Sequence, residues 1–252
     1  MDTGLRGRAV LVTGGSAGIG RASAIAFGRE GAKVALTYAS DSDAANRVAG
    51  EVEDAGGEGL AVPLDLSEPE SIDAAVEQVL ARWTGLTTLV ANAVRWPQDA
   101  GGPLVESDPR VWERAMRANL EGTARAVRAA WPALSASGQG RVVLVSTGVT
   151  RHGMAGASAY ATAKAGLEGL ASALKWEGGE QGILINTVAP GFTVTERNLT
   201  TVGDEVRESV RSRTPSGRLS VPEDVSSAIV YLGSPANGNV SGAYLPVAGG
   251  TD

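Results

Sequence analysis

Short apolar runs alternate along the chain with longer segments in which apolar residues recur every three or four positions. Seven runs are almost continuously apolar, as in strands that are buried on both faces of a parallel sheet. They cover residues 8–13, 33–38, 60–64, 88–91, 141–146, 183–188 and 243–247. The segments between them have helical periodicity; Ile19, Ala22, Ala26 and Phe27, for example, share one helical face. This pattern predicts one doubly wound α/β domain over residues 1–252, with a seven-stranded parallel sheet between two helical layers.

Local signals predict where several helices begin. Ser67 with Glu70, and Ser220 with Glu223, have the spacing of a capping box, in which two side chains satisfy backbone N–H groups of the first turn. Asp108-Pro109 is typical of an N-cap followed by the first helical residue. We therefore expect helices to start at all three places.

Two stretches, about 94–107 and 190–220, lack a clear period. Long irregular segments in α/β proteins often cover a ligand, so we expect a substrate lid around 190–220. Arg207, Arg211 and Arg213 lie in this segment. We interpret them as a solvated face, with contact to an anionic substrate as the alternative for one of them.

Composition excludes several classes of protein. The 252 residues include no Cys and one His, and the net charge is -6. A disulfide scaffold, thiolate metal sites and a Cys nucleophile are therefore excluded, and we expect no metal. An acidic chain is unsuited to nonspecific nucleic-acid binding. No leader and no long apolar span are visible, so we expect a cytoplasmic protein that does not enter a membrane. We interpret His152 as a loop or pocket residue, not as a catalytic base.

A glycine-rich loop follows the first predicted strand and opens the first predicted helix. Gly14 permits a tight turn, Gly18 allows close approach of a pyrophosphate, and Gly20 allows close packing of the helix on the sheet. The helix N-terminus offers free N–H groups to an anion. The loop therefore predicts a Rossmann-type dinucleotide site, which also includes Ser16, Ala17 and Ile19. Its spacing, Gly-x-x-x-Gly-x-Gly, resembles that of the short-chain dehydrogenases/reductases.

The end of the second predicted strand indicates which dinucleotide binds. An acid there would bind the ribose diol of NAD and repel the 2′-phosphate of NADP. The strand ends instead at Tyr38, Ala39 and Ser40, and we interpret Asp41 and Asp43 beyond it as helix-capping residues. We therefore predict NADP(H) as the cofactor. The 2′-phosphate is expected to contact backbone N–H groups and the hydroxyls of Ser16, Tyr38 and Ser40.

Tyr160 and Lys164 are four residues apart, on one face of a predicted helix. A free tyrosine has a pKa of about 10, too high for ready proton exchange near neutrality. A neighbouring ammonium favours the phenolate and lowers that pKa. We therefore predict that Tyr160 is the acid that protonates a ketone oxygen.

Similarity to the short-chain dehydrogenase/reductase family extends over nearly the whole chain. Asp65 and Leu66 match positions at the adenine, and Asn92 and Ala93 match positions below the cofactor. Asn119 matches a residue at a helix kink in the proton relay. The remaining matches lie beside the nicotinamide (Pro190, Gly191, Thr193 and Thr195) and near the C-terminus (Val247 to Gly250). The resemblance implies that Tyr160 donates the proton and that Lys164 also holds the nicotinamide ribose. It further implies that Asn119 positions a water linking Lys164 to solvent.

Several positions depart from the family pattern. Val94 stands where the family usually has Gly, and Ala248 replaces an Asp. Ala17 and Ala39 stand where many NADP-dependent relatives carry a basic residue.

The Ser that orients the carbonyl in this family usually lies 13 residues before the Tyr. Here that position is Thr147, whose hydroxyl can donate the same hydrogen bond. Ser146, one residue earlier, is the alternative.

These features together predict an NADP(H)-dependent ketoreductase that transfers a hydride between the nicotinamide and a ketone or secondary alcohol. The overall pattern resembles 3-oxoacyl-carrier-protein reductases. The residues at 94, 96 and 147 also suit a ketoreductase that tailors aromatic polyketides, such as angucyclines. Trp96, Met154 and Phe192 would then line a pocket for a polycyclic aromatic ketone.

Other interpretations remain open. One is an NAD-dependent sugar or secondary-alcohol dehydrogenase, and another is a catalytically silent NADP-binding protein. The resemblance also implies a homotetramer, or a homodimer, formed through the helices that contain Asn119 and Tyr160.

Overall fold

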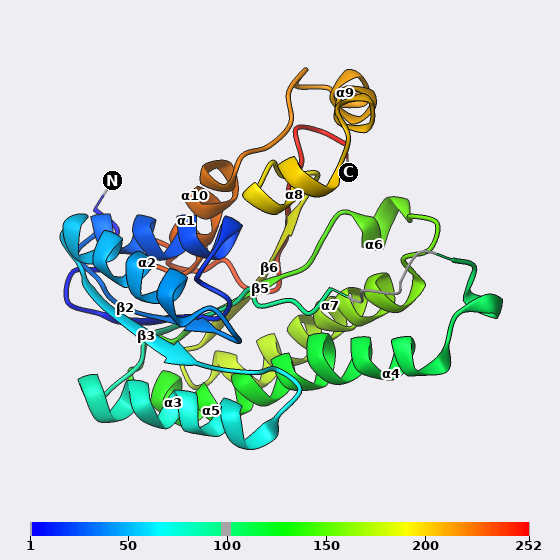
Figure 1. The fold of residues 1–252 in the computed structure, drawn as a ribbon. Helices are drawn as coiled ribbons and strands as arrows, with labels where there is room; N and C mark the ends of the chain where they lie inside the picture. The colour runs from blue at the N-terminus through cyan, green and yellow to red at the C-terminus, as the bar shows by residue number, and fades with distance from the viewer. Residues whose placement is uncertain (1, 97–101, 252) are drawn as a thin grey trace.

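A parallel β-sheet lies at the centre of the structure, a computed structural model that describes residues 2–96 and 102–251 (Figure 1). Within these residues the sheet has seven strands in the order β3-β2-β1-β4-β5-β6-β7. The strands are β1 (Ala9–Val12), β2 (Lys33–Tyr38), β3 (Glu58–Pro63), β4 (Thr88–Ala91), β5 (Arg141–Val145), β6 (Leu184–Pro190) and β7 (Tyr244–Val247). Each apolar run predicted to be a strand forms one, with small shifts at the ends.

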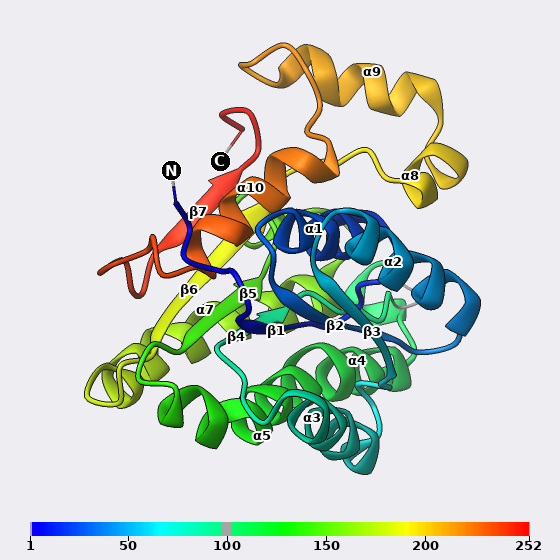
Figure 2. The ribbon, with the colours of Figure 1, turned by 90° about the vertical axis from the view of Figure 1, so that its left-hand side faces the viewer.

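Helices cover both faces of this sheet (Figure 1, Figure 2). One face carries α1 (Gly18–Arg29), α2 (Ser42–Asp54) and α10 (Pro222–Leu232). The other carries α3 (Pro69–Trp83), α4 (Pro109–Met116), the π-helical turn η2 (Arg117–Gly122), α5 (Thr123–Ala136) and α7 (Ser158–Gly179). The predicted doubly wound, three-layer α/β architecture is confirmed.

Alternation of side chains along the strands produces two apolar cores, one on each face of the sheet. Leu11 of β1 belongs to the core that reaches Leu167 of α7. Val10 and Val12, its neighbours, belong to the core that reaches Phe27 of α1. Burial of each such side chain stabilises the fold by roughly 1.5–3 kcal/mol. The two cores hold the sheet rigidly, so residues that follow the carboxyl ends of the strands are fixed along one edge.

Helices begin at all three predicted places, with α3 at Pro69, α4 at Pro109 and α10 at Pro222, but the capping residues differ from those predicted in two of them. Asp108 caps α4, accepting a hydrogen bond from the N–H of Arg110 at 2.9 Å. Both predicted capping boxes are wrong. The Ser67 hydroxyl accepts from Arg95 instead, and α3 begins after Glu68 without a side-chain cap. Ser220 donates to the carbonyl of Val247, so it does not cap α10.

The segment 190–220, expected to be irregular, contains two helices, α8 (Glu196–Thr201) and α9 (Asp204–Arg213). They follow β6, and α9 stands away from the sheet in both views (Figure 1, Figure 2). The charged residues of α9 pair along the helix, and none of its residues is buried. The sequence therefore shows no apolar periodicity from which this helix could be predicted. Of the stretch 94–107, residues 97–101 lie outside the described residues, and Leu104–Glu106 forms the 3₁₀ turn η1. The described helices include none that is long and apolar enough to cross a membrane.

Candidate active site

The glycine loop between β1 and α1 is packed too tightly for larger residues. Gly14 has φ +64°, and a Cβ there would lie 2.8 Å from the Cα of Ala93. Gly18 has φ +53°. A Cβ at Gly20 would lie 2.1 Å from the carbonyl oxygen of Gly14. The three glycines are therefore required by backbone conformation and by close contact.

The N-terminus of α1 fits an anionic ligand. Ala17 is the N-cap residue and provides no side-chain hydrogen bond, and the first turn contains no acidic residue. The first N–H groups of the helix therefore have no side-chain acceptor, and the helix dipole favours a negative charge beside them. A Cβ at Gly18 would lie 3.3 Å from the Cγ2 of Thr195, so the start of α8 borders this loop. These features fit the diphosphate of a dinucleotide.

Asn92 supports the glycine loop from the adjacent strand. Its amide donates to the carbonyls of Thr13 at 3.0 Å and Gly14 at 3.1 Å. The backbone N–H groups of Asn92 and Ala93 both donate to the Thr13 hydroxyl at 3.0 Å. The Asn-Ala segment therefore holds the loop in place.

At the end of β2, Tyr38 is half-buried, whereas Ala39 and Ser40 are exposed. The carboxylate of Asp41 accepts from the N–H of Ala44 at 2.8 Å and caps α2, as predicted. Asp43 lies in the first turn of the same helix. Asp41 is thus engaged by the helix that it starts.

Asp65 lies at the expected adenine end of the site, but it has a partner that the sequence did not indicate. Arg95 Nη1 lies 3.4 Å from both carboxylate oxygens of Asp65 and donates to the Ser67 hydroxyl at 3.0 Å. The residues are far apart in the sequence, and no local pattern marks such an ion pair. Its partly exposed position limits its contribution to stability.

Thr147, Tyr160 and Lys164 meet at the carboxyl end of β5. Thr147 follows the strand, while Tyr160 and Lys164 lie on α7. The Thr147 hydroxyl interacts with the Tyr160 phenol and favours its charged form. Lys164 is 2% exposed, and its Nζ donates to the carbonyl of Val145 at 2.8 Å.

Burial controls the charge states of this group. It raises the pKa of the Tyr160 phenol, and the interaction with Thr147 acts in the opposite direction. Burial also lowers the pKa of the Lys164 ammonium to about 8. In this structure the net shift of the Tyr160 pKa is upward, so the lowering by Lys164 predicted from the sequence stays a prediction. The ammonium donates its hydrogen bond to a backbone carbonyl, that of Val145.

Ser146 and Thr147 point to different surroundings. The Ser146 hydroxyl contacts α7, with the carbonyl of Lys164 at 3.3 Å and the carboxylate of Glu168 at 3.0 Å. The Thr147 hydroxyl reaches Tyr160. The Ser146 hydroxyl is thus engaged with α7, which leaves Thr147 as the candidate for the residue that orients a carbonyl.

Asn119 lies in the π-helical turn η2, which corresponds to the expected helix kink. Its side chain accepts from the N–H of Arg95 at 2.8 Å and donates to the Arg95 carbonyl at 3.0 Å. Its own carbonyl accepts from the Thr123 hydroxyl at 3.0 Å. Asn119 therefore clamps the segment that leads to Trp96.

Trp96 packs directly against the predicted proton donor. The ring centres of Trp96 and Tyr160 are 4.6 Å apart, with the planes inclined by 50°. The Cζ of Arg197, from α8, lies 5.7 Å from the centre of the indole. Neighbouring Val94 is 45% exposed.

The other predicted pocket and lid residues range from half-buried to exposed. Met154 is half-exposed, Phe192 is half-buried, and His152 is exposed at the end of α6 (Val149–His152). In α9, Arg207 pairs with Asp204 and Arg211 with Glu208. Arg213 donates to Ser209. The described residues contain no cluster of three or more potential metal ligands.

The segment after β6 is held against the end of β7. The N–H of Gly191 donates to the Val247 carbonyl at 3.1 Å. A Cβ at Gly191 would lie 2.7 Å from the Cβ of Ala248. Ala248, which replaces an Asp, thus contacts the Pro190-Gly191 turn. Thr193 donates to the carbonyl of Gly191 at 3.2 Å.

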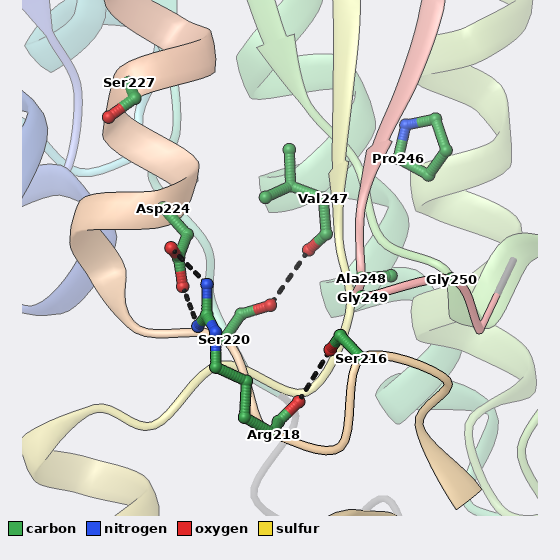
Figure 3. A pocket seen from close by; sticks show the side chains of 10 residues that line it. All are labelled: Ser216, Arg218, Ser220, Asp224, Ser227, Pro246, Val247, Ala248, Gly249 and Gly250. Carbon is green, nitrogen blue, oxygen red and sulfur yellow. Dashed lines mark hydrogen bonds and ion pairs between the residues drawn. The ribbon is translucent and has the colours of Figure 1, made fainter.

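A separate cavity of about 510 Å³ lies between the end of β7 and the start of α10 (Figure 3). Its charged residues neutralise each other, because Arg218 donates to both oxygens of Asp224 at 2.6 and 2.8 Å. Ser220, also in its lining, donates to Val247. Tyr160 and Lys164 do not line this cavity, so its geometry does not associate it with the candidate chemistry.

The sequence is similar to known proteins over nearly the whole chain. A family profile described as enoyl-(acyl carrier protein) reductase matches residues 14–252. The chain is 35% identical over 246 residues to the 3-oxoacyl-[acyl-carrier-protein] reductase FabG of Vibrio cholerae, covering 98% of each chain.

Two solved structures are similar throughout. A mutant short-chain dehydrogenase/reductase of Serratia marcescens has a TM-score of 0.91 and 31% identity, with 98% of each chain covered. A 7α-hydroxysteroid dehydrogenase, solved with NADH and 7-oxo glycochenodeoxycholic acid, has a TM-score of 0.92 and 27% identity, covering 99% of this chain and 96% of the other. By sequence, fold and the positions of its glycine loop and Tyr-Lys pair, the chain belongs to the short-chain dehydrogenase/reductase family.

Proposed function

We propose that the protein is an NADP(H)-dependent ketoreductase that interconverts a ketone and a secondary alcohol. The observation that carries this proposal is that Thr147, Tyr160 and the buried Lys164 lie together at the carboxyl end of β5, where the Lys164 Nζ donates to the carbonyl of Val145 at 2.8 Å. This arrangement offers two O–H groups to a single carbonyl oxygen.

The residues around the site fit a dinucleotide. The uncapped start of α1 and the tightly packed glycine loop would hold the diphosphate. The loop contacts would come from Gly14, Ser16, Ala17, Gly18, Ile19 and Gly20. The remaining contacts would come from Tyr38, Ala39, Ser40, Asp65, Leu66, Asn92, Ala93, Tyr160, Lys164, Pro190, Gly191, Thr193 and Thr195. When bound, the nicotinamide supplies or accepts the hydride.

In the reducing direction, Thr147 donates a hydrogen bond to the substrate oxygen and Tyr160 donates its proton to it. Burial raises the pKa of Tyr160, so the phenol stays protonated through the neutral range and is ready to act as the acid. Lys164 then stabilises the phenolate and returns a proton to it. Asn119 is proposed to position the water that reconnects Lys164 to solvent.

NADP is proposed over NAD because no acidic side chain is available among the last residues of β2. Asp41, the nearest acid, is engaged in capping α2. The hydroxyls of Ser16, Tyr38 and Ser40 would contact the 2′-phosphate. Parallel binding titrations with NADPH and NADH test this preference; tighter binding of NADH would reject it.

The proposed substrate is a ketone on a planar ring, as in aromatic polyketides, because Trp96 presents an indole beside Tyr160. The relatives named above act on an acyl-carrier-protein thioester and on a bile acid, so a 3-oxoacyl thioester is the second candidate. NADPH consumption should be assayed with acetoacetyl thioesters and with polycyclic aromatic ketones. Turnover of thioesters alone would reject the ring ketone.

We also propose a cytoplasmic homotetramer, or a homodimer, built through the helices that carry Asn119 and Tyr160. Many residues between Ala157 and Ala173 on α7 are small, which permits close approach of a second helix. Sedimentation equilibrium tests this assembly, and a monomer at micromolar concentration would reject it.

A further inference from the structure

Arg197 extends the candidate site outward from the proton donor. It lies in the first turn of α8, and its Cζ is 5.7 Å from the centre of the Trp96 indole. The indole in turn lies 4.6 Å, centre to centre, from the ring of Tyr160. The guanidinium is therefore one aromatic ring beyond the phenol.

The charge of Arg197 is available to a ligand. Within residues 2–96 and 102–251, no carboxylate pairs with its guanidinium, although Arg207 and Arg211 of the neighbouring helix each have an acidic partner. The adjacent Glu196 is directed to Arg21, with 3.9 Å between the charged atoms. Arg197 is exposed, so it can contact a ligand without first breaking an ion pair.

This combination of groups favours a particular ligand chemistry. The flat indole can pack against a planar ring. A guanidinium beside it can hold a carboxylate through two parallel hydrogen bonds. The chain has a net charge of -6, so an anionic substrate needs such a local cation to approach the site favourably.

We propose that Arg197 determines substrate specificity by binding a carboxylate on a substrate whose planar ring packs against Trp96. The ketone of that substrate then faces Tyr160. This inference rests on the proposed function, because it places the carboxylate of a ketone substrate at the end of the site remote from the reacting oxygen.

Kinetics with a matched pair of aryl ketones test the proposal. The substrates are 4-acetylbenzoate and its methyl ester, which differ in charge at the carboxyl end. For Arg197→Met, kcat/KM for the acid should fall about five- to tenfold through KM, while the ester changes less than about twofold. Arg197→Lys, which keeps the charge but not the two parallel hydrogen bonds, should retain only part of the preference, and 0.5 M salt should weaken it. Arg213→Met, which removes the same charge from α9, should leave the acid-to-ester ratio unchanged.

An equal fall in kcat/KM for the acid and the ester would overturn the proposal, because Arg197 would then only support the indole. No fall for either substrate would also overturn it, because Arg197 would then have no role in substrate binding. Calorimetric titration of 1-naphthoate with saturating NADP⁺ separates this result from failure of the proposed function. Binding that weakens about fivefold or more in Arg197→Met, without turnover of any ketone, would support Arg197 and reject the reductase. Turnover without a charge preference would reject only the role of Arg197.

Discussion

Replacing Lys164 by methionine should stabilise the protein at neutral pH while removing its proposed catalytic ammonium. Burial lowers the pKa of Lys164 from its ordinary value of 10.5 to about 8. At ~1.4 kcal/mol per pKa unit, the folded state therefore loses ~3 kcal/mol by holding this ammonium at pH 7. Methionine has a similar length, but it forfeits the hydrogen bond to Val145, which is worth ~1 kcal/mol. The expected net gain for Lys164→Met is about 2 kcal/mol.

The pH dependence of the free energy of unfolding shows whether the buried charge of Lys164 causes this gain. Between pH 8 and 10.5 the unfolded lysine binds more protons than the folded one, so the free energy of unfolding of the wild type rises with pH. Below pH 8 both states are protonated, and the full penalty is present. The advantage of Lys164→Met should therefore be constant below pH 8, vanish between about pH 9 and 10, and reverse by about pH 10.5, where only the lost hydrogen bond to Val145 remains. The raised pKa of Tyr160 affects both proteins, so its contribution cancels in the difference.

Urea unfolding followed by circular dichroism, without cofactor, at several pH values from 7 to 10 measures this difference. Lys175→Met is the matched control, because Lys175 lies on the same helix beside the exposed Trp176. Its free energy of unfolding should change by less than about 0.5 kcal/mol at every pH. A difference between wild type and Lys164→Met that stays constant from pH 7 to 10 would refute the argument that burial lowers the lysine pKa.

Three further substitutions test the site. Thr147→Ala should lower kcat about 10²-fold, as expected on loss of a donor to the reacting oxygen, whereas Ser146→Ala should lower it less than about threefold in the same assay. Gly20→Ala should abolish NADPH binding in a fluorescence titration, because its Cβ would lie 2.1 Å from a loop carbonyl. Gly50→Ala, where nothing lies within 4 Å, should bind normally. Asn119→Ala removes two hydrogen bonds to Arg95 and should lower the urea-unfolding free energy by about 2 kcal/mol; a change below about 0.5 kcal/mol would contradict the clamp.

Local sequence patterns were sufficient to predict the sheet and the reacting pair. Strands such as β5 are buried on both faces, so continuous apolarity identifies them without knowledge of their neighbours. The four-residue spacing of Tyr160 and Lys164 similarly needs only the helical period. The glycine loop was identifiable because its glycines act within one strand-loop-helix unit.

Contacts between distant segments could not be predicted in this way. Arg95 pairs with Asp65 and donates to the hydroxyl of Ser67, a residue that the local pattern assigned to a capping box. Arg197 meets Trp96 only because α8 folds back over the site. The spacing in the sequence places Lys164 near Tyr160, but it does not show that burial lowers the pKa of the lysine. It also does not show that the ammonium donates to the carbonyl of Val145.

Turnover by Tyr160→Phe, measured beside NADPH affinity, tests the central claim most directly. The substitution removes only the phenol oxygen, so the Kd for NADPH should change less than about threefold. With the best ketone substrate, kcat should fall by at least about 10²-fold, the lower end of what a positioned general acid contributes. Retention of both cofactor binding and turnover would contradict the assignment of Tyr160 as the proton donor.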